Sequence, residues 1–156
     1  MKKVRLLYRL LIILNIFTTI LIGVQMAFLV IPDLLHSKVY EDNVLGSFNH
    51  LILTSLLALI VTGSFKIQQG IRYILKEGFF NKISELKFKL AGKIFIAFAL
   101  CRLLYIIITM HAFKLNELIN NSILAFVVVL VGIGLLIFSD FIKNGGVLKE
   151  ENELTI

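Results

Sequence analysis

The stretch LLIILNIFTTILIGVQMAFLVI, residues 10–31, is 22 residues long and contains no charged side chain. A helix rises about 1.5 Å per residue, so roughly 20 residues cross the ~30 Å hydrocarbon core of a bilayer. The apolar region of a secretory signal is shorter, at about 7–15 residues. This stretch therefore predicts a first membrane-spanning helix that is retained, rather than a leader that is cleaved.

Three further stretches have the same character. Residues 44–65 contain His50 but no Lys, Arg, Asp or Glu, residues 94–110 contain Arg102 as their only charged residue, and residues 118–139 contain none. Continuous apolar runs favour helices, because transmembrane β-barrels show alternating segments of about 10 residues. The sequence therefore predicts an all-α polytopic membrane protein, a four-transmembrane-helix bundle in a single domain of residues 1–156. We place the spans at about residues 10–31, 44–65, 90–111 and 118–142, with a tail of residues 143–156.

The composition agrees with a lipid environment. Apolar residues make up 58% of the chain and the mean hydropathy is +0.93, whereas soluble domains contain about 45–50% apolar residues even with glycine included. The net charge of +6 is typical of Lys and Arg that flank membrane spans, and no nucleic-acid-binding motif accompanies it. The single cysteine, Cys101, excludes an intramolecular disulfide.

The distribution of Lys and Arg predicts the orientation of the chain. Thirteen of the 16 basic residues precede the first span, flank or lie within the segment between the second and third spans, or follow the fourth span. The other two connections contain only Lys38 and Lys114. Because basic residues accumulate on the cytoplasmic side, we expect both termini and the central segment to face the cytoplasm.

The central segment is predicted to be a helical hairpin that extends spans two and three into the cytoplasm. Apolar residues recur at helical spacing before and after a turn near residues 78–81, and Asn81 is a suitable N-cap for the second helix. The exposed face of this hairpin is basic and contains Lys76, Lys82, Lys87 and Lys89. Such a face either anchors the hairpin on anionic lipid or docks a cytoplasmic protein.

The end of the chain is predicted to leave the last helix at Asn144, Gly145 and Gly146, because consecutive glycines are typical of a helix end. The ten residues that follow are acidic and contain Glu150, Glu151 and Glu153. Three alternatives remain for this tail: it folds back on the basic hairpin, it binds a partner, or it is disordered.

Arg102 is the strongest departure from the apolar pattern, because it lies at the centre of the third run. An arginine at the bilayer centre costs about 2.5–3.5 kcal/mol on insertion scales, so it is expected to face the bundle interior and find an acceptor. Candidate acceptors are Gln25, Tyr105, Asp33 and His50. Structural pairing or snorkelling is one interpretation, and coordination of a ligand or ion is the other.

Other polar and small residues predict contacts between helices. In the first span Asn15, Thr18, Thr19 and Gln25 can form interhelical hydrogen bonds. Arg102, Gln25, Asn15 and Tyr105 are therefore the candidate intramembrane polar residues. Small residues allow close helix approach, within the chain or in a dimer; they are Gly23, Ala27, Ala97, Cys101, Gly132 and Gly134.

Catalytic and metal-binding chemistry finds no support in the sequence. His36, His50 and His111 lack the spacing of metal ligands, and no Cys/His cluster exists. No nucleophile has a neighbouring base in the pattern, and no phosphate-binding glycine loop is present. We therefore expect no enzyme activity, no metal and no cofactor.

Two segments resemble a known family. In residues 76–92 the run GFFN, residues 78–81, precedes Leu86, Leu90 and Gly92, and residues 138–156 end in LKEENELTI. Both segments resemble the YoaS-like family of uncharacterised bacterial four-span membrane proteins. That family usually has a proline where this chain has Phe79. No activity or catalytic residue is established for the family, so none is carried over.

The resemblance implies a place in the bacterial inner membrane. Members of the family are often encoded beside a small helix-turn-helix regulator, which implies a cytoplasmic protein partner. The leading hypothesis is thus a regulatory or interaction protein that engages such a partner through Lys76, Lys82, Lys87, Lys89, Glu150, Glu151 and Glu153. The alternative is a small oligomeric transporter or channel that uses Arg102. The expected partners are the lipid bilayer, a cytoplasmic protein and a second copy of the chain, with no direct nucleic-acid contact.

Overall fold

The computed structural model describes residues 2–30, 43–109 and 115–154, and these residues contain helices and no strand. The helices are α1 (Lys2–Val30), α3 (Asn43–Glu77), α4 (Lys82–Thr109) and α5 (Leu115–Leu154). All four are long and apolar enough to cross a membrane, over Lys2–Ala27, Gly46–Glu77, Lys82–Thr109 and Leu118–Leu154. The prediction of an all-α chain with four apolar helices of membrane-spanning length is confirmed.

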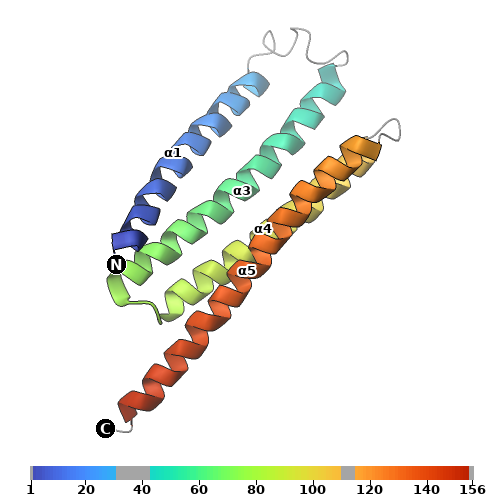
Figure 1. Ribbon diagram of the computed structural model, residues 1–156. Coiled ribbons are helices and arrows are strands. Elements are labelled where there is room, and N and C mark those ends of the chain that lie inside the picture. Colours follow the sequence, from blue (N-terminus) through green and yellow to red (C-terminus); the bar gives the residue numbers. More distant parts are fainter. Residues whose placement is uncertain (1, 31–42, 110–114, 155–156) are drawn as a thin grey trace.

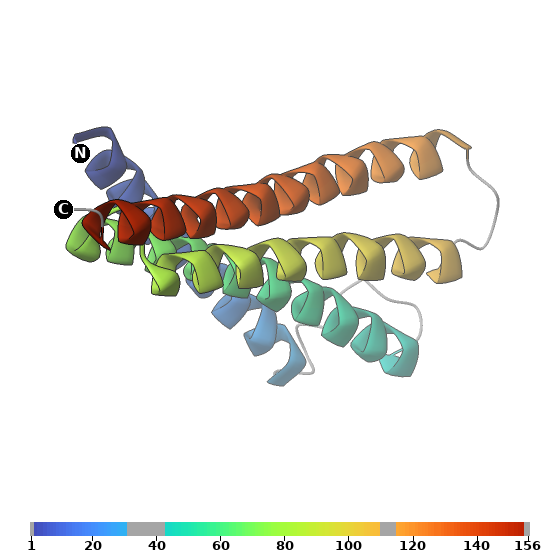
Figure 2. The same cartoon turned by 90° about the horizontal axis from the view of Figure 1, so that it is seen from below.

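The helices lie in chain order, and each packs against the next (Figures 1 and 2). α1 packs on α3, α3 on α4, and α4 on α5, and the last of these interfaces is the most extensive. Among the described residues, the backbone of α1 does not closely approach that of α4 or α5. The result is a helical bundle that is open between its first and last helices.

Both chain ends and the α3–α4 turn lie at one end of the bundle (Figure 1). We call this the terminal end, made of residues 2–14, 66–93 and 135–154. The opposite part, made of residues 15–30, 43–65, 94–109 and 115–134, is the far end. This placement is what an even number of membrane crossings requires, while the identity of the compartment on each side remains a prediction.

The buried core lies at the terminal end. Ile71, Ile74, Phe88 and Ile142 come from three helices and are between 1% and 4% exposed. Val4, Tyr8 and Leu11 of α1 and Ile67, Leu75, Leu135 and Phe138 pack against this cluster. The Phe88 and Phe138 rings meet edge to face, with centroids 4.9 Å apart, a geometry worth about 0.5–1.5 kcal/mol beyond area burial. All four helices therefore converge at this end.

Two residues, Gly78 and Asn81, determine the turn between α3 and α4. Gly78 has a φ of 94°, a left-handed conformation that glycine adopts without steric cost, and its N–H donates to the Ile74 carbonyl at 3.0 Å. The Asn81 side-chain oxygen accepts from the Ser84 N–H at 2.7 Å, which confirms the predicted N-cap. The predicted helical hairpin is present, and its cytoplasmic location remains a prediction.

The predicted end of the last helix is wrong, because α5 continues through Gly145 and Gly146 to Leu154. A Cβ atom added at Gly145 would overlap the ring of Phe80 in the α3–α4 turn. The glycine therefore permits close packing of the turn on α5 rather than a helix end. Figure 1 shows the last turns of α5 continuing beyond the hairpin, so the acidic residues do not fold back on it.

Close approach of α4 and α5 depends on a pair of glycines. A Cβ atom at Gly92 would lie 2.7 Å from the Gly132 carbonyl oxygen, and one at Gly132 would lie 2.9 Å from the Gly92 carbonyl oxygen. Of the other predicted small residues, Gly23 and Gly134 have open space around them, and Ala97 and Cys101 are exposed. Gly132 is thus the predicted small residue that mediates close helix contact within the chain.

The contrast between Gly132 and Gly134 gives a matched test of packing. Gly132→Ala should lower the free energy of unfolding by about 1–3 kcal/mol, because the new methyl group overpacks the α4–α5 interface. Gly134→Ala meets nothing within 4 Å, and alanine is the better helix former by about 0.8–1 kcal/mol, so its stability should be unchanged or higher. Thermal unfolding in a neutral detergent checks both variants. Equal melting temperatures would contradict the close approach.

Candidate intramembrane anion site

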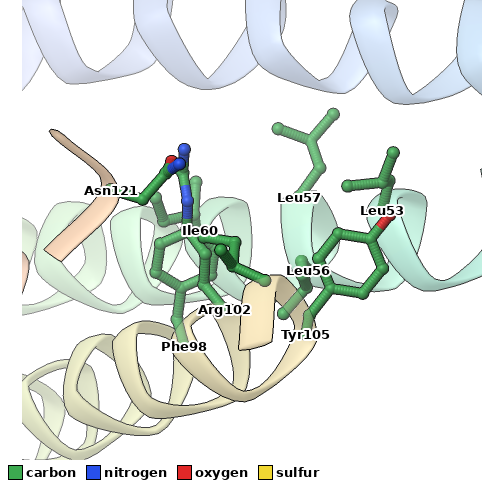
Figure 3. Close-up of a pocket in the computed structure, with 9 residues that line it drawn as sticks. Leu53, Leu56, Leu57, Ile60, Phe98, Arg102, Tyr105 and Asn121 are labelled. Carbon is green, nitrogen blue, oxygen red and sulfur yellow. The ribbon is translucent and has the colours of Figure 1, made fainter. Parts of the chain in front are cut away.

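A pocket of about 420 Å³ lies at the far end between α3, α4 and α5 (Figure 3). Its lining consists of Leu53, Leu56, Leu57, Ile60, Phe98, Arg102, Tyr105, Ile106 and Asn121. The helical period explains this set, because Leu53, Leu57 and Ile60 lie on one face of α3. On α4, Phe98, Arg102 and Ile106 share one face in the same way. The pocket is therefore formed by two facing helices and is completed by α5.

The pocket wall is mostly apolar and contains a single charge. Six of the nine lining residues are Leu, Ile or Phe, and the other three are Arg102, Tyr105 and Asn121. Figure 3 shows the Arg102 side chain reaching toward Asn121, whereas Tyr105 and Leu53 lie toward the other end of the pocket. The pocket thus has a charged end at Arg102 and Asn121, and the rest of its lining is apolar apart from Tyr105.

Arg102 is half-buried, and within the described residues it forms neither an ion pair nor a hydrogen bond. The carboxylates whose side chains are described all belong to the terminal end; they are Glu77, Glu85, Asp140, Glu150, Glu151 and Glu153. Asp33, one of the expected acceptors, lies outside the described residues. A guanidinium carries five donors that normally bind carboxylate or phosphate. Among the residues that the structure describes, Arg102 therefore lines the pocket and meets no carboxylate.

None of the other three expected acceptors, Tyr105, His50 and Gln25, forms a hydrogen bond with Arg102, so those expectations are wrong. The Tyr105 hydroxyl donates to the side-chain oxygen of Asn49 and joins α4 to α3. The His50 Nε2 lies 2.8 Å from the backbone carbonyl oxygen of Gln25 and joins α3 to α1. The Gln25 residue thus belongs to the α1–α3 interface and not to the pocket.

The predicted interhelical bond of Asn15 is confirmed. Asn15 is 1% exposed, and its amide nitrogen donates to the Gln68 side-chain oxygen at 2.5 Å. Thr18 and Thr19 instead donate to carbonyl groups of their own helix, so the prediction of interhelical bonds for them is wrong. The four predicted intramembrane polar residues therefore separate into two places. Asn15 and Gln25 lie between α1 and α3, and Arg102 and Tyr105 line the pocket.

The sequence interpretation missed Asn49, Gln68 and Asn121. Asn49 precedes Leu53, Leu56 and Ile60 at helical spacing, so the period of α3 could have placed it beside the pocket. Asn121 is the middle residue of a short N-x-S glycosylation pattern, residues 120–122, whose acceptor is Asn120. The position of Asn121 on the pocket side of α5 depends on how α5 is rotated. No sequence pattern indicates that rotation.

The predicted partner surface is exposed but divided. Lys76, Lys82 and Lys89 are exposed and Lys87 is half-buried, all near the α3–α4 turn. The three glutamates lie on the helical extension of α5, and Lys149 pairs with Glu153 at 3.6 Å within that extension. The surface therefore comprises a basic turn and a separate acidic helix end.

Comparisons with known proteins add no assignment: no protein-family model, no curated protein and no solved structure matches this chain. The resemblance to the YoaS-like family therefore remains a prediction. The described residues contain no group of three or more His, Cys, Asp or Glu that could hold a metal ion.

The lack of a partner for Arg102 among the described residues has a measurable consequence for stability. Arg102→Leu should raise the melting temperature in neutral detergent, because it removes a desolvated charge that no described residue compensates. Tyr105→Phe in the same pocket should lower the melting temperature, because it leaves the Asn49 oxygen without this donor, a loss worth about 1–3 kcal/mol. A destabilised Arg102→Leu variant would indicate that Arg102 is paired in the folded protein.

Proposed function

We propose that this chain is a four-span membrane protein that binds an anionic ligand at Arg102 inside the membrane. The observation that carries the proposal is a half-buried arginine, unpaired within the described residues, that faces a pocket of about 420 Å³. Intramembrane charges are expensive and usually mark ligand or ion sites. A bound anion would supply the acceptor that the described part of the chain does not supply.

The orientation follows from the distribution of basic residues. With 13 basic residues at the termini and central segment, the terminal end would face the cytoplasm of a bacterial inner membrane and the α3–α4 turn would lie in the cytoplasm. The pocket would then lie in the outer half of the membrane. The packed core around Phe88 and Ile142 would separate it from the cytoplasm.

A small transporter is one form of this function. Transport requires that the site become accessible from each side in turn, as in alternating access. The core at the terminal end supports a single access side in this conformation, because all four helices meet there. A carrier would therefore need a second conformation in which this core opens, whereas a binding or sensing protein would not.

Ligand-induced stabilisation tests anion binding directly. The full chain in neutral detergent is titrated with acetate, inorganic phosphate, oleate and phosphatidylglycerol, and its melting temperature is followed. At least one anion should raise the melting temperature, since a ligand at 100 times its dissociation constant stabilises by about 2.7 kcal/mol. Arg102→Ala should abolish the increase.

The matched control is Lys89→Ala, which removes an exposed charge at the terminal end and should leave the increase intact. Identical responses of the parent protein and Arg102→Ala to every anion would refute the proposed function.

A second candidate function is supported by the extension of α5. Leu148 and Leu154 are 61% and 87% exposed on a helix that continues beyond the hairpin, and Glu150 and Glu153 are exposed beside them. Exposed leucines on an acidic helix suit a cytoplasmic protein with a basic apolar groove. A small helix-turn-helix regulator, the kind of protein often encoded beside members of the YoaS-like family that this chain resembles, is the candidate partner.

Co-purification with a small helix-turn-helix regulator from the same organism tests the second function. Deletion of residues 147–156 should reduce its recovery at least tenfold, as should a Leu148→Ala, Leu154→Ala double variant. Lys2→Ala, an exposed charge on α1 at the same end, serves as the control and should leave recovery unchanged. Full recovery with the deleted chain would remove the support for this function.

A further inference from the structure

We propose that the ligand of the Arg102 pocket is an amphiphile with one acidic head group and an apolar chain, which enters from the surrounding bilayer. The head would be a carboxylate or a phosphate ester, two groups that share the chemistry recognised by a guanidinium. This inference rests on the proposed function and names the class of ligand.

The composition of the wall selects against a small hydrophilic anion. Six of the nine lining residues are apolar, and transfer of an ion from water to such a wall costs several kcal/mol per ion unless donors replace its hydration. Inorganic phosphate has oxygens on every side, but the charged donors of this pocket lie only on the Arg102 side. The other phosphate oxygens would face mostly apolar side chains. A single acidic head can place its oxygens against Arg102 and leave its remainder apolar.

The length of the pocket agrees with an amphiphile. Arg102 and Asn121 lie at one end, and Leu57, Leu56 and Leu53 extend away from them along α3 (Figure 3). A head at Arg102 would therefore place its apolar chain along these leucines. The volume of about 420 Å³ lies within the range of about 300–1,000 Å³ that is usual for small-molecule pockets.

The exposure of the lining residues indicates the direction of access. Phe98 is 5% exposed and Leu56 is 8% exposed, so both form the floor, while Leu53 is 42% exposed at the rim. In a membrane, exposed leucines of a spanning helix contact lipid, so the rim opens toward acyl chains. A ligand that already resides in the bilayer reaches Arg102 without crossing water.

Native mass spectrometry of the full chain, released from neutral detergent, tests the inference. The probes are oleate, phosphatidylglycerol, oleyl alcohol, acetate and inorganic phosphate. Oleate, phosphatidylglycerol or both should bind, whereas oleyl alcohol lacks the charge and acetate lacks the chain, so each should bind at least tenfold more weakly. Arg102→Ala should weaken binding of the amphiphile at least tenfold, since a hydrogen bond to a charged group is worth about 1.5–3 kcal/mol.

Two further variants keep the test informative if Arg102→Ala folds poorly. Arg102→Lys retains the charge and should retain part of the binding, because lysine lacks the bidentate fork. Ile60→Trp fills the pocket and leaves Arg102 in place, so it should weaken binding of the amphiphile while Lys89→Ala does not.

The outcomes separate the two proposals. Arg102-dependent binding of oleate alone assigns a free carboxylate, and binding of phosphatidylglycerol alone assigns a lipid phosphate, and either supports the inference. Arg102-dependent binding of acetate or inorganic phosphate without the amphiphiles would overturn the inference and leave the proposed function standing. Equal binding of oleate and oleyl alcohol would also overturn it, and no Arg102-dependent binding of any probe would overturn both.

Discussion

The close packing of α3, α4 and α5 at the terminal end is the contact on which the rest of the structure depends. In lipid, apolar side chains gain little by leaving acyl chains for one another, so helices associate through tight packing and hydrogen bonds. Both are found at this end, where Ile71, Ile74, Phe88 and Ile142 form the buried cluster. Ser84 donates to the Gly70 carbonyl at 2.9 Å and Ser139 donates to the Glu85 carbonyl at 3.1 Å. At the far end α3 and α4 leave a pocket between them, which α5 completes with Asn121.

The sequence predicts the helices better than the contacts between them, and the reason is physical. A long run with at most one charged residue is stable as a helix in a bilayer, so the four helices of membrane-spanning length follow from the distribution of charge. The partner of a polar residue depends on the rotation of two helices about their axes. Asn15 was therefore predicted to bond across helices, but Gln68 as its partner was not.

Gly145 shows that a contact between distant segments can also change where a helix ends. In a water-exposed helix, two consecutive glycines favour a helix end, since glycine is about 0.8–1 kcal/mol less favourable than alanine in a helix. Here the absence of a side chain allows the Phe80 ring to pack on the helix backbone, and α5 continues. Local propensity alone does not reveal this use of glycine, because the contact joins segments far apart in the sequence.

Some polar atoms in this bundle carry a cost in stability. The side-chain oxygens of Asn15, Ser64 and Gln69 are buried and have no hydrogen-bond partner in the described part of the chain, and such groups cost about 1–3 kcal/mol each. These three oxygens lie on α1 and α3, whereas Arg102 lies on α4 and faces a cavity. Arg102 differs from these oxygens because it lies beside a cavity. A ligand in the cavity has room to pair with the Arg102 guanidinium, whereas a closed helix interface has no room for a ligand.

The helix α5 contributes to both candidate functional regions, the pocket and the exposed extension. It contributes Asn121 to the pocket and Leu148 to the exposed extension, and it is one continuous helix of 40 residues, which corresponds to about 60 Å. Gly132 holds it against Gly92 at a point between these two residues. A tilt of α5 about that contact would move its two ends in opposite directions, so a wider pocket would require a displaced extension. Energetic coupling between two sites requires a structural element that contacts both sites and has two arrangements. Among the described helices, α5 is the one that reaches from the pocket to the exposed extension.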